Sequence, residues 1–242
     1  MNSVHPPGSF KSLLICNLKL QHRQGFTAAW AVISLFYILG LSFIPGNIKT
    51  VIIPLVLLSE PSTFAMIFTG AILLLERDER LLENLFITPM SIRAYMVSKA
   101  LALSLPAAVS TTVITLVLRG PSLSLLIIPP AVILTTLVFG LYTFIPASAS
   151  RDIMGLLGRI GLYGSPFALS ILDYFGVFPG VHHYLLPSKG SLELMQAAAG
   201  TGETDGLTMI LSLASICLWI VLIIPAAEKQ FRKNLIHTGA IA

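Results

Sequence analysis

Charged residues are scarce in this chain. Asp, Glu, Lys and Arg make up only 11% of its 242 residues, and hydrophobic residues make up 55%. An average soluble domain is roughly 25% charged. The shortage of charge excludes an ordinary soluble protein and predicts an integral membrane protein.

Several motifs that carry chemistry are also missing. The sequence has no Gly-x-x-x-x-Gly-Lys-Ser/Thr phosphate loop, so we do not expect this chain to bind ATP itself. It has no GxGxxG loop, nucleophile elbow or metal triad, which leaves little case for an enzyme. His182 and His183 are adjacent, but neighbouring side chains point apart and no third ligand follows, so we predict no metal site.

Cysteine is nearly absent as well. Cys16 and Cys217 are the two that occur, and they fall at opposite ends of the topology predicted below. Two distant cysteines form no framework, so neither a disulfide nor a zinc site is predicted.

Long apolar runs make up most of the sequence. About 20 apolar residues are needed to cross the hydrocarbon core of a bilayer. Six runs approach or exceed that length, at residues 26–44, 51–75, 94–118, 123–147, 160–178 and 207–227. The remaining length is too small for a second globular domain. We therefore predict one all-α membrane domain with six transmembrane helices over residues 1–242.

The basic residues between these runs predict the orientation, because Lys and Arg favour the cytoplasmic side. With the N-terminus inside, the outside holds only Lys49, Arg119 and Lys189, and the other twelve lie inside. Both termini and the 76–91 segment are thus expected to be cytoplasmic. The formal net charge of +4 follows from this topology, and we do not interpret it as nucleic-acid binding.

The segment before the first run is predicted to be an interfacial helix over residues 10–24. Phe10, Leu13, Leu14 and Leu18 form an apolar stripe, with basic residues on the other side. A frayed tail close to the membrane is the alternative.

Residues 76–91 carry the densest charge in the chain and separate the second run from the third. Five consecutive charged residues, Glu76 to Arg80, precede an apolar set at the spacing of one helix face, Leu81, Leu82, Leu85 and Phe86. Proline disfavours helical geometry in the residue before it, so Thr88-Pro89 should end this helix. Ser91 is a suitable N-cap for the next one.

Two carboxylates fall inside apolar runs. Glu60 lies near the middle of 51–75, beside Pro61, and Asp173 lies deep in 160–178. A charge at such a depth costs roughly 3 kcal/mol on insertion scales, so each should face a partner, a cavity or water. Both can line a transport path, and Glu60 can instead form a neutral hydrogen bond to a neighbouring helix.

Glycines recur every third residue at Gly155, Gly158, Gly161 and Gly164. This spacing leaves a nearly bare strip along a helix where another helix can approach closely. The partner helix can belong to the same protomer or to a second subunit.

The residues of the 76–91 segment resemble the coupling region of ABC-2 type transporter permeases. That region has a Glu/Arg-rich helix ending in Leu-x-x-Thr-Pro-hydrophobic-Ser, followed by Tyr-x-x-x-Lys. The matching residues here are Glu79, Glu83, Leu85, Thr88, Pro89, Ser91, Tyr95 and Lys99. The stretches SEPSTFAMIFTGAILLLE and LLPSKGSLELMQAAAG are similar to the small drug-export, fluoroquinolone-type branch. Arg80 and Leu81 stand where that family usually has Gly-Thr.

The resemblance implies a permease subunit in the cytoplasmic (inner) membrane of a prokaryote. It implies export of a small or amphipathic substrate that is drug-like, lipid-like or a peptide. It also implies a second permease copy or a similar permease, and a separate cytoplasmic ABC ATPase that holds the ATP and Mg. The residues expected to couple to that ATPase are Glu76, Glu79, Arg80, Glu83, Leu85, Phe86, Thr88 and Pro89. Residues 179–206 are expected to form short helices that cap the outer side.

Two other functions stay open at this point. One is the membrane subunit of a haem exporter for cytochrome c maturation, which is also a six-helix protein with a charged loop. The other is an ATP-independent channel or proton-coupled carrier that uses Glu60 and Asp173. Carriers normally show internal repeats with broken helices, and no clear repeat relates the two halves of this sequence.

Overall fold

The computed structural model of the chain describes residues 10–79, 81, 91–121, 123–177, 185–201 and 205–237. Helices make up nearly all of these residues, and none of them forms a strand. The all-α prediction is therefore confirmed for the described part of the chain.

The helices follow one another along the chain with short connections. In order they are α1 (Phe10–Arg23), α2 (Phe26–Ser42), α3 (Gly46–Ser59), the π-helical turn η1 (Glu60–Phe64), α4 (Ala65–Asp78), α6 (Ile92–Arg119), the 3₁₀ turn η2 (Leu123–Leu126), α7 (Ile128–Ala149), α8 (Ile153–Gly164), the 3₁₀ turn η3 (Ser165–Ala168), α9 (Leu169–Tyr174), α10 (Pro187–Ala199) and α11 (Gly206–His237).

Five of the helical stretches are long and apolar enough to cross a bilayer. They are Gly46–Asp78, Ile92–Arg119, Ile128–Ala149, Ile153–Tyr174 and Gly206–Asn234. The predicted first span is shorter, because α2 has 17 residues. It makes a sixth span only together with α1, from which it is bent by 64°. A helix is present where residues 10–24 were predicted to form one, and its position at a membrane interface stays a prediction.

Local sequence signals explain where several helices begin and end. The Ser91 side chain accepts a hydrogen bond from the Ala94 N–H at 3.2 Å, which confirms the predicted N-cap of α6. Gly200 adopts a left-handed φ of 61° and ends α10. At Pro61 the helix continues through the π-helical turn η1, because the wider turn accommodates a residue that has no N–H.

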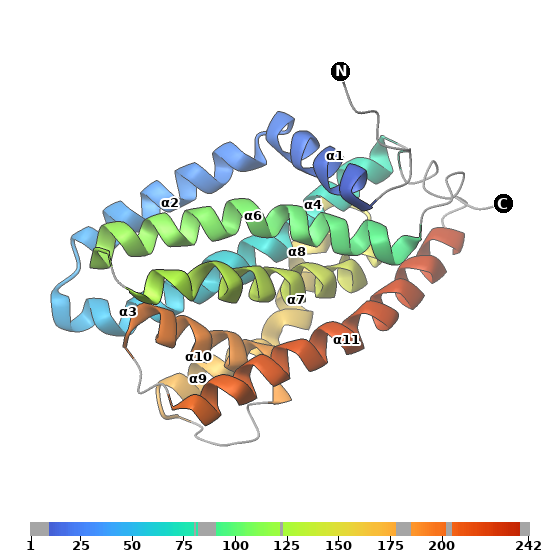
Figure 1. Ribbon diagram of the computed structural model, residues 1–242. Coiled ribbons are helices and arrows are strands. Elements are labelled where there is room, and N and C mark those ends of the chain that lie inside the picture. Colours follow the sequence, from blue (N-terminus) through green and yellow to red (C-terminus); the bar gives the residue numbers. More distant parts are fainter. Residues whose placement is uncertain are drawn as a thin grey trace.

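The bundle is built around α7, the most buried of the spanning helices, which packs against α4, α6, α10 and α11. α8 and α11 are the most exposed. In Figure 1 both ends of the described chain lie at the same end of the bundle as the end of α4 and the start of α6. We call this the termini end. The arrangement agrees with a topology in which the termini and the 76–91 segment share one side of the membrane.

At the opposite end of the bundle, α10 packs closely on α11. A Cβ atom added at Gly190 of α10 would lie 2.8 Å from the backbone oxygen of Ser212 and 3.3 Å from its Cα. The absence of a side chain at this position therefore sets how closely the two helices approach.

We expect Gly190→Ala to destabilise the bundle, because its methyl group would meet backbone that cannot move aside locally. Overpacking of this kind costs about 1–3 kcal/mol. The midpoint of thermal unfolding in detergent measures the effect. Gly40→Ala is the matched control, since a Cβ there meets nothing within 4 Å. A Gly190→Ala midpoint equal to that of the control would contradict the close approach.

Candidate functional site

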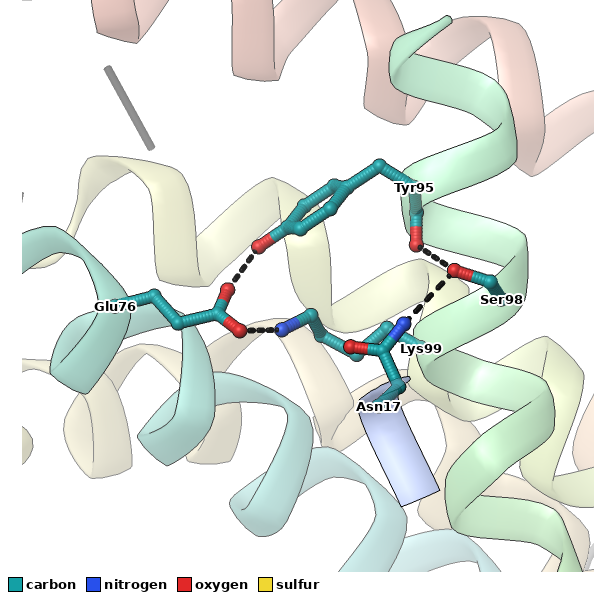
Figure 2. A network of polar contacts seen from close by, with 5 residues as sticks. All are labelled: Asn17, Glu76, Tyr95, Ser98 and Lys99. Atoms are coloured by element: carbon teal, nitrogen blue, oxygen red, sulfur yellow. Dashed lines mark hydrogen bonds and ion pairs between the residues drawn. The ribbon is translucent and has the colours of Figure 1, made fainter. Parts of the chain in front are cut away.

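A network of buried charged and polar side chains lies near the termini end of the bundle (Figure 2). The Glu76 carboxylate, in the last turn of α4, forms an ion pair with Lys99 and accepts a hydrogen bond from the Tyr95 hydroxyl. The side chains of Lys99 and Glu76 are 0% and 7% exposed. Tyr95 and Lys99 can both reach this one carboxylate because residues four apart share a helix face.

The network joins three helices through hydrogen bonds. The Ser98 hydroxyl donates to the Tyr95 carbonyl at 2.9 Å and accepts from the Asn17 amide of α1 at 3.0 Å. Figure 2 shows the Glu76, Lys99 and Asn17 side chains converging beside α6. As a result α1, α4 and α6 are held in one arrangement close to both ends of the 79–91 connection.

Aromatic contacts extend the network to the remaining central helices. The Tyr95 ring lies 6.1 Å from the ring of Phe144 in α7 and 6.1 Å from that of Phe231 in α11. The ammonium of Lys99 lies 4.8 Å from the centre of the Tyr95 ring, within range of a cation–π interaction. The Tyr95 ring thus connects the buried ion pair to α7 and α11.

Arg77, next in sequence to Glu76, bonds in another direction. Its guanidinium donates to the carbonyls of Ser150 and Arg151, at 2.6 and 2.9 Å, where α7 ends. A cation at a helix C-terminus satisfies free carbonyls and interacts favourably with the helix dipole. The end of α4 is thereby tied to the turn between α7 and α8.

Glu60 is completely buried in η1, in the middle of a spanning stretch. It accepts hydrogen bonds from two hydroxyls of α6, those of Ser110 and of Thr111, the latter at 2.6 Å. Hydrogen bonding between Glu60 and a neighbouring helix, one of the two alternatives raised by the sequence, is therefore present, with Glu60 as the acceptor. A role for Glu60 in a transport path stays a prediction.

Asp173 lies in α9, near the opposite end of the bundle. Its carboxylate forms an ion pair with Lys189 of α10 at 2.7 Å, and Lys189 pairs with Glu193 at 2.6 Å. Burial lowers the pKa of Lys189, but the hydrogen bonds and charges of the two carboxylates outweigh burial and raise that pKa above its usual value. Glu60 and Asp173 thus have partners on different helices: Glu60 bonds to α6 and Asp173 bonds to α10.

The structure describes only part of the predicted coupling set. Glu76 is buried in the network, and Glu79 is exposed at the end of α4. The other predicted members, Arg80, Glu83, Leu85, Phe86, Thr88 and Pro89, lie outside the described residues. Their role in coupling stays a prediction.

Sequence reasoning missed three participants in this region. Arg77 was counted only as a topology signal, and Asn17 and Ser98 were not singled out. The Tyr-x-x-x-Lys pattern was noticed, and it pairs two side chains on one helix face. The sequence signal for their partner is Glu76 itself, an acid directly after the end of an apolar run.

Neutralising Lys99 as Lys99→Met should strongly destabilise the protein, because the buried Glu76 carboxylate would lose its counter-charge. Removal of one partner of a buried ion pair costs about 3–5 kcal/mol, whereas replacing both is often nearly neutral. Thermal unfolding in nanodiscs should therefore show a large loss for Lys99→Met and recovery of most of it in the Glu76→Gln/Lys99→Met double variant.

The control is Arg93→Met, which breaks an ion pair to Glu228 in which the Arg93 side chain is 62% exposed. Exposed pairs contribute only about 0–1 kcal/mol, so this variant should unfold close to the wild type. A double variant as unstable as Lys99→Met alone would show that the ion pair is not what holds α4 and α6 together.

Comparison with known proteins adds independent information. The model of the fluoroquinolones export permease protein family matches residues 9–239. Two proteins named fluoroquinolones export permease protein, from two strains of Mycobacterium tuberculosis, are each 28% identical to this chain over 187 residues. These matches cover 75% of this chain and 77% of each relative. No solved structure gives a significant match. The long apolar helices and the match over nearly the whole length lead to one conclusion: the chain belongs to the fluoroquinolones export permease family of membrane proteins.

Proposed function

We propose that the chain is the permease subunit of an ATP-driven exporter that moves a small amphipathic, drug-like molecule across the cytoplasmic membrane. A separate ABC ATPase subunit would hydrolyse the ATP. The family match and the names of the mycobacterial relatives support a role in drug export. The lack of a phosphate loop in this chain supports an ATPase on another polypeptide.

The buried network is the observation that best supports coupling to such a partner. The 79–91 connection begins three residues after Glu76 and ends four residues before Tyr95. Glu76 and Tyr95 are bonded to each other inside the bundle. A force applied to this connection would therefore reach α4 and α6 together, and through Asn17 it would reach α1.

The mechanism requires two arrangements of the bundle that the partner distinguishes. A ligand shifts a conformational equilibrium only as far as its affinities for the two states differ. We propose that ATP-driven closure of the ATPase displaces the 79–91 segment. The ion pair and Arg77 would transmit this displacement to α6 and to the α7–α8 turn as a rigid movement.

A second permease copy would complete the path. α8 offers a face for it, because Cβ atoms added at Gly158 or Gly161 meet nothing within 4 Å. This part of the glycine strip is therefore free of close contacts within the protomer. Met154 and Leu162 of the same helix are 77% and 71% exposed, which supports contact with another protein or with lipid.

The docking role is tested with the double variant Glu83→Ala/Phe86→Ala. The variant should insert normally yet lose most of the co-purifying ATPase and of ATP-dependent export, because the proposed contact surface is removed. Mass spectrometry of the gently purified complex measures the partner, and ATPase and transport assays measure coupling.

Asp205→Asn is the matched control, since this residue precedes α11 at the opposite end of the bundle and should leave the partner bound. Unchanged recovery of an ATPase with Glu83→Ala/Phe86→Ala would argue against docking through this segment. A protein that purifies alone and supports proton-dependent flux in liposomes would replace the ABC proposal with the carrier alternative.

A further inference from the structure

A pocket of about 450 Å³ lies between α2 and α6. Its size falls in the usual range for sites that bind small molecules. Leu35 and Val109, two of its lining residues, are 56% and 65% exposed. The pocket therefore borders the outer surface of the protomer, and in a membrane a molecule dissolved in the bilayer could reach it.

The walls are mainly apolar, and three of the lining residues, Thr27, Ser34 and Ser110, carry a hydroxyl. Trp30, Leu35 and Val109 supply apolar surface. Pro106 interrupts the hydrogen-bond ladder of α6 at this level, since it has no N–H to donate. The pocket thus suits a molecule with an apolar body and one polar group.

The Ser34 and Ser110 hydroxyls belong to a hydrogen-bond network with more contacts than hydrogens to donate. Ser34 contacts the Trp30 carbonyl at 2.7 Å and the Ser110 hydroxyl, and Ser110 contacts Glu60. Thr111 contacts Glu60 at 2.6 Å and a carbonyl of its own helix at 2.9 Å. Each hydroxyl has one hydrogen to donate and two lone pairs. Three hydroxyl hydrogens, or four when Glu60 is protonated, therefore serve five contacts, so at least one oxygen lone pair is left to accept a further hydrogen bond.

The missing hydrogens define the chemistry that the network would recognise. Glu60 has no access to solvent, so an ionised carboxylate at this position needs donors or a cation nearby. A primary ammonium brings three N–H donors, and its positive charge would favour the ionised form of Glu60. A lipid acyl chain brings neither of these.

We propose that the α2–α6 pocket binds a small amphipathic cation. Its ammonium donates to the Ser34 and Ser110 oxygens, and its apolar body lies against Trp30 and Leu35. Glu60 is a positioning residue that acts through Ser110. The proposal rests on the proposed function, since it names the class of molecule that the exporter would take up from the bilayer.

Binding can be measured without ATP or any partner chain. The sequence has two tryptophans, so Trp219→Phe leaves Trp30 as the only reporter of the pocket. Three probes separate the effects of charge and of donors: 4-phenylbutylammonium, its trimethylammonium analogue, and the 4-phenylbutyl methyl ether. Trp30 emission in nanodiscs is followed during titration, with partitioning corrected by empty nanodiscs.

The primary ammonium should change Trp30 emission at about tenfold lower concentration than either of the other two probes, because only it donates charged hydrogen bonds. Ser110→Ala and Glu60→Gln should each remove about that tenfold preference. Thr112→Val is the control, since the Thr112 hydroxyl bonds only to a carbonyl of its own helix in the described contacts and does not line the pocket. It should leave binding unchanged.

Three results would overturn the proposal. The first is an ether that binds as tightly as the ammonium, which would make the pocket a site for lipid chains. The second is a Ser110→Ala variant that keeps the full preference for the ammonium; this variant leaves Glu60 bonded to Thr111, so it tests the point even if Glu60→Gln does not fold. The third is that none of the probes alters Trp30 emission. If the unaltered protein binds the ammonium as expected but co-purifies with no ATPase, that result would count against the proposed function alone.

Discussion

The arrangement of the bundle depends on one constraint: a buried lysine–glutamate ion pair must be shielded from water and fully hydrogen-bonded by the surrounding helices. Lys99 and Glu76 lose their hydration on folding, and a pair of this kind is tolerated only when its remaining hydrogen-bonding capacity is used and water is excluded. Tyr95 supplies the second hydrogen bond, and Phe144 and Phe231 pack against the Tyr95 ring. Five helices thus contribute to one polar centre, counting Asn17 on α1. Their relative positions are specified by this centre more sharply than leucine contacts alone would specify them.

Away from that centre, most hydroxyls within the apolar part of the bundle are bonded locally. Thr112, Thr115 and Thr143 donate to carbonyls of their own helices. This satisfies each hydroxyl but does little to hold neighbouring helices together. Ser110 is different, because it joins α2, η1 and α6 through Ser34 and Glu60. Polar contacts between helices therefore occur at three levels: near the termini end, beside the pocket, and near the opposite end, where Asp173 of α9 pairs with Lys189 of α10.

The sequence predicted the helical class, five of the spans and the Ser91 cap, because these depend on hydrophobic run length and local hydrogen bonding. It did not predict which groups would meet. Glu76 and Lys99 are separated by 23 residues, and Arg77 and Ser150 by 73, so their pairing depends on how the helices pack. The fourth helix begins later than expected, at Ile128, and the helical stretch of the fifth begins earlier, at Ile153, because Asp152 caps it. Most of the predicted coupling residues lie at positions 80 and 82–90, outside the described residues, so their role stays a prediction.

The position of Glu76 also bears on how the protein is made. During synthesis, the stretch ending in α4 leaves the ribosome before α6 exists, so its terminal carboxylate has no ammonium to bond. Until Lys99 arrives, Glu76 is better placed toward the headgroups, where it keeps its water. α4 would therefore reach its final position only after α6 is made. The two helices would enter the bilayer together as a hairpin in which Lys99 neutralises Glu76.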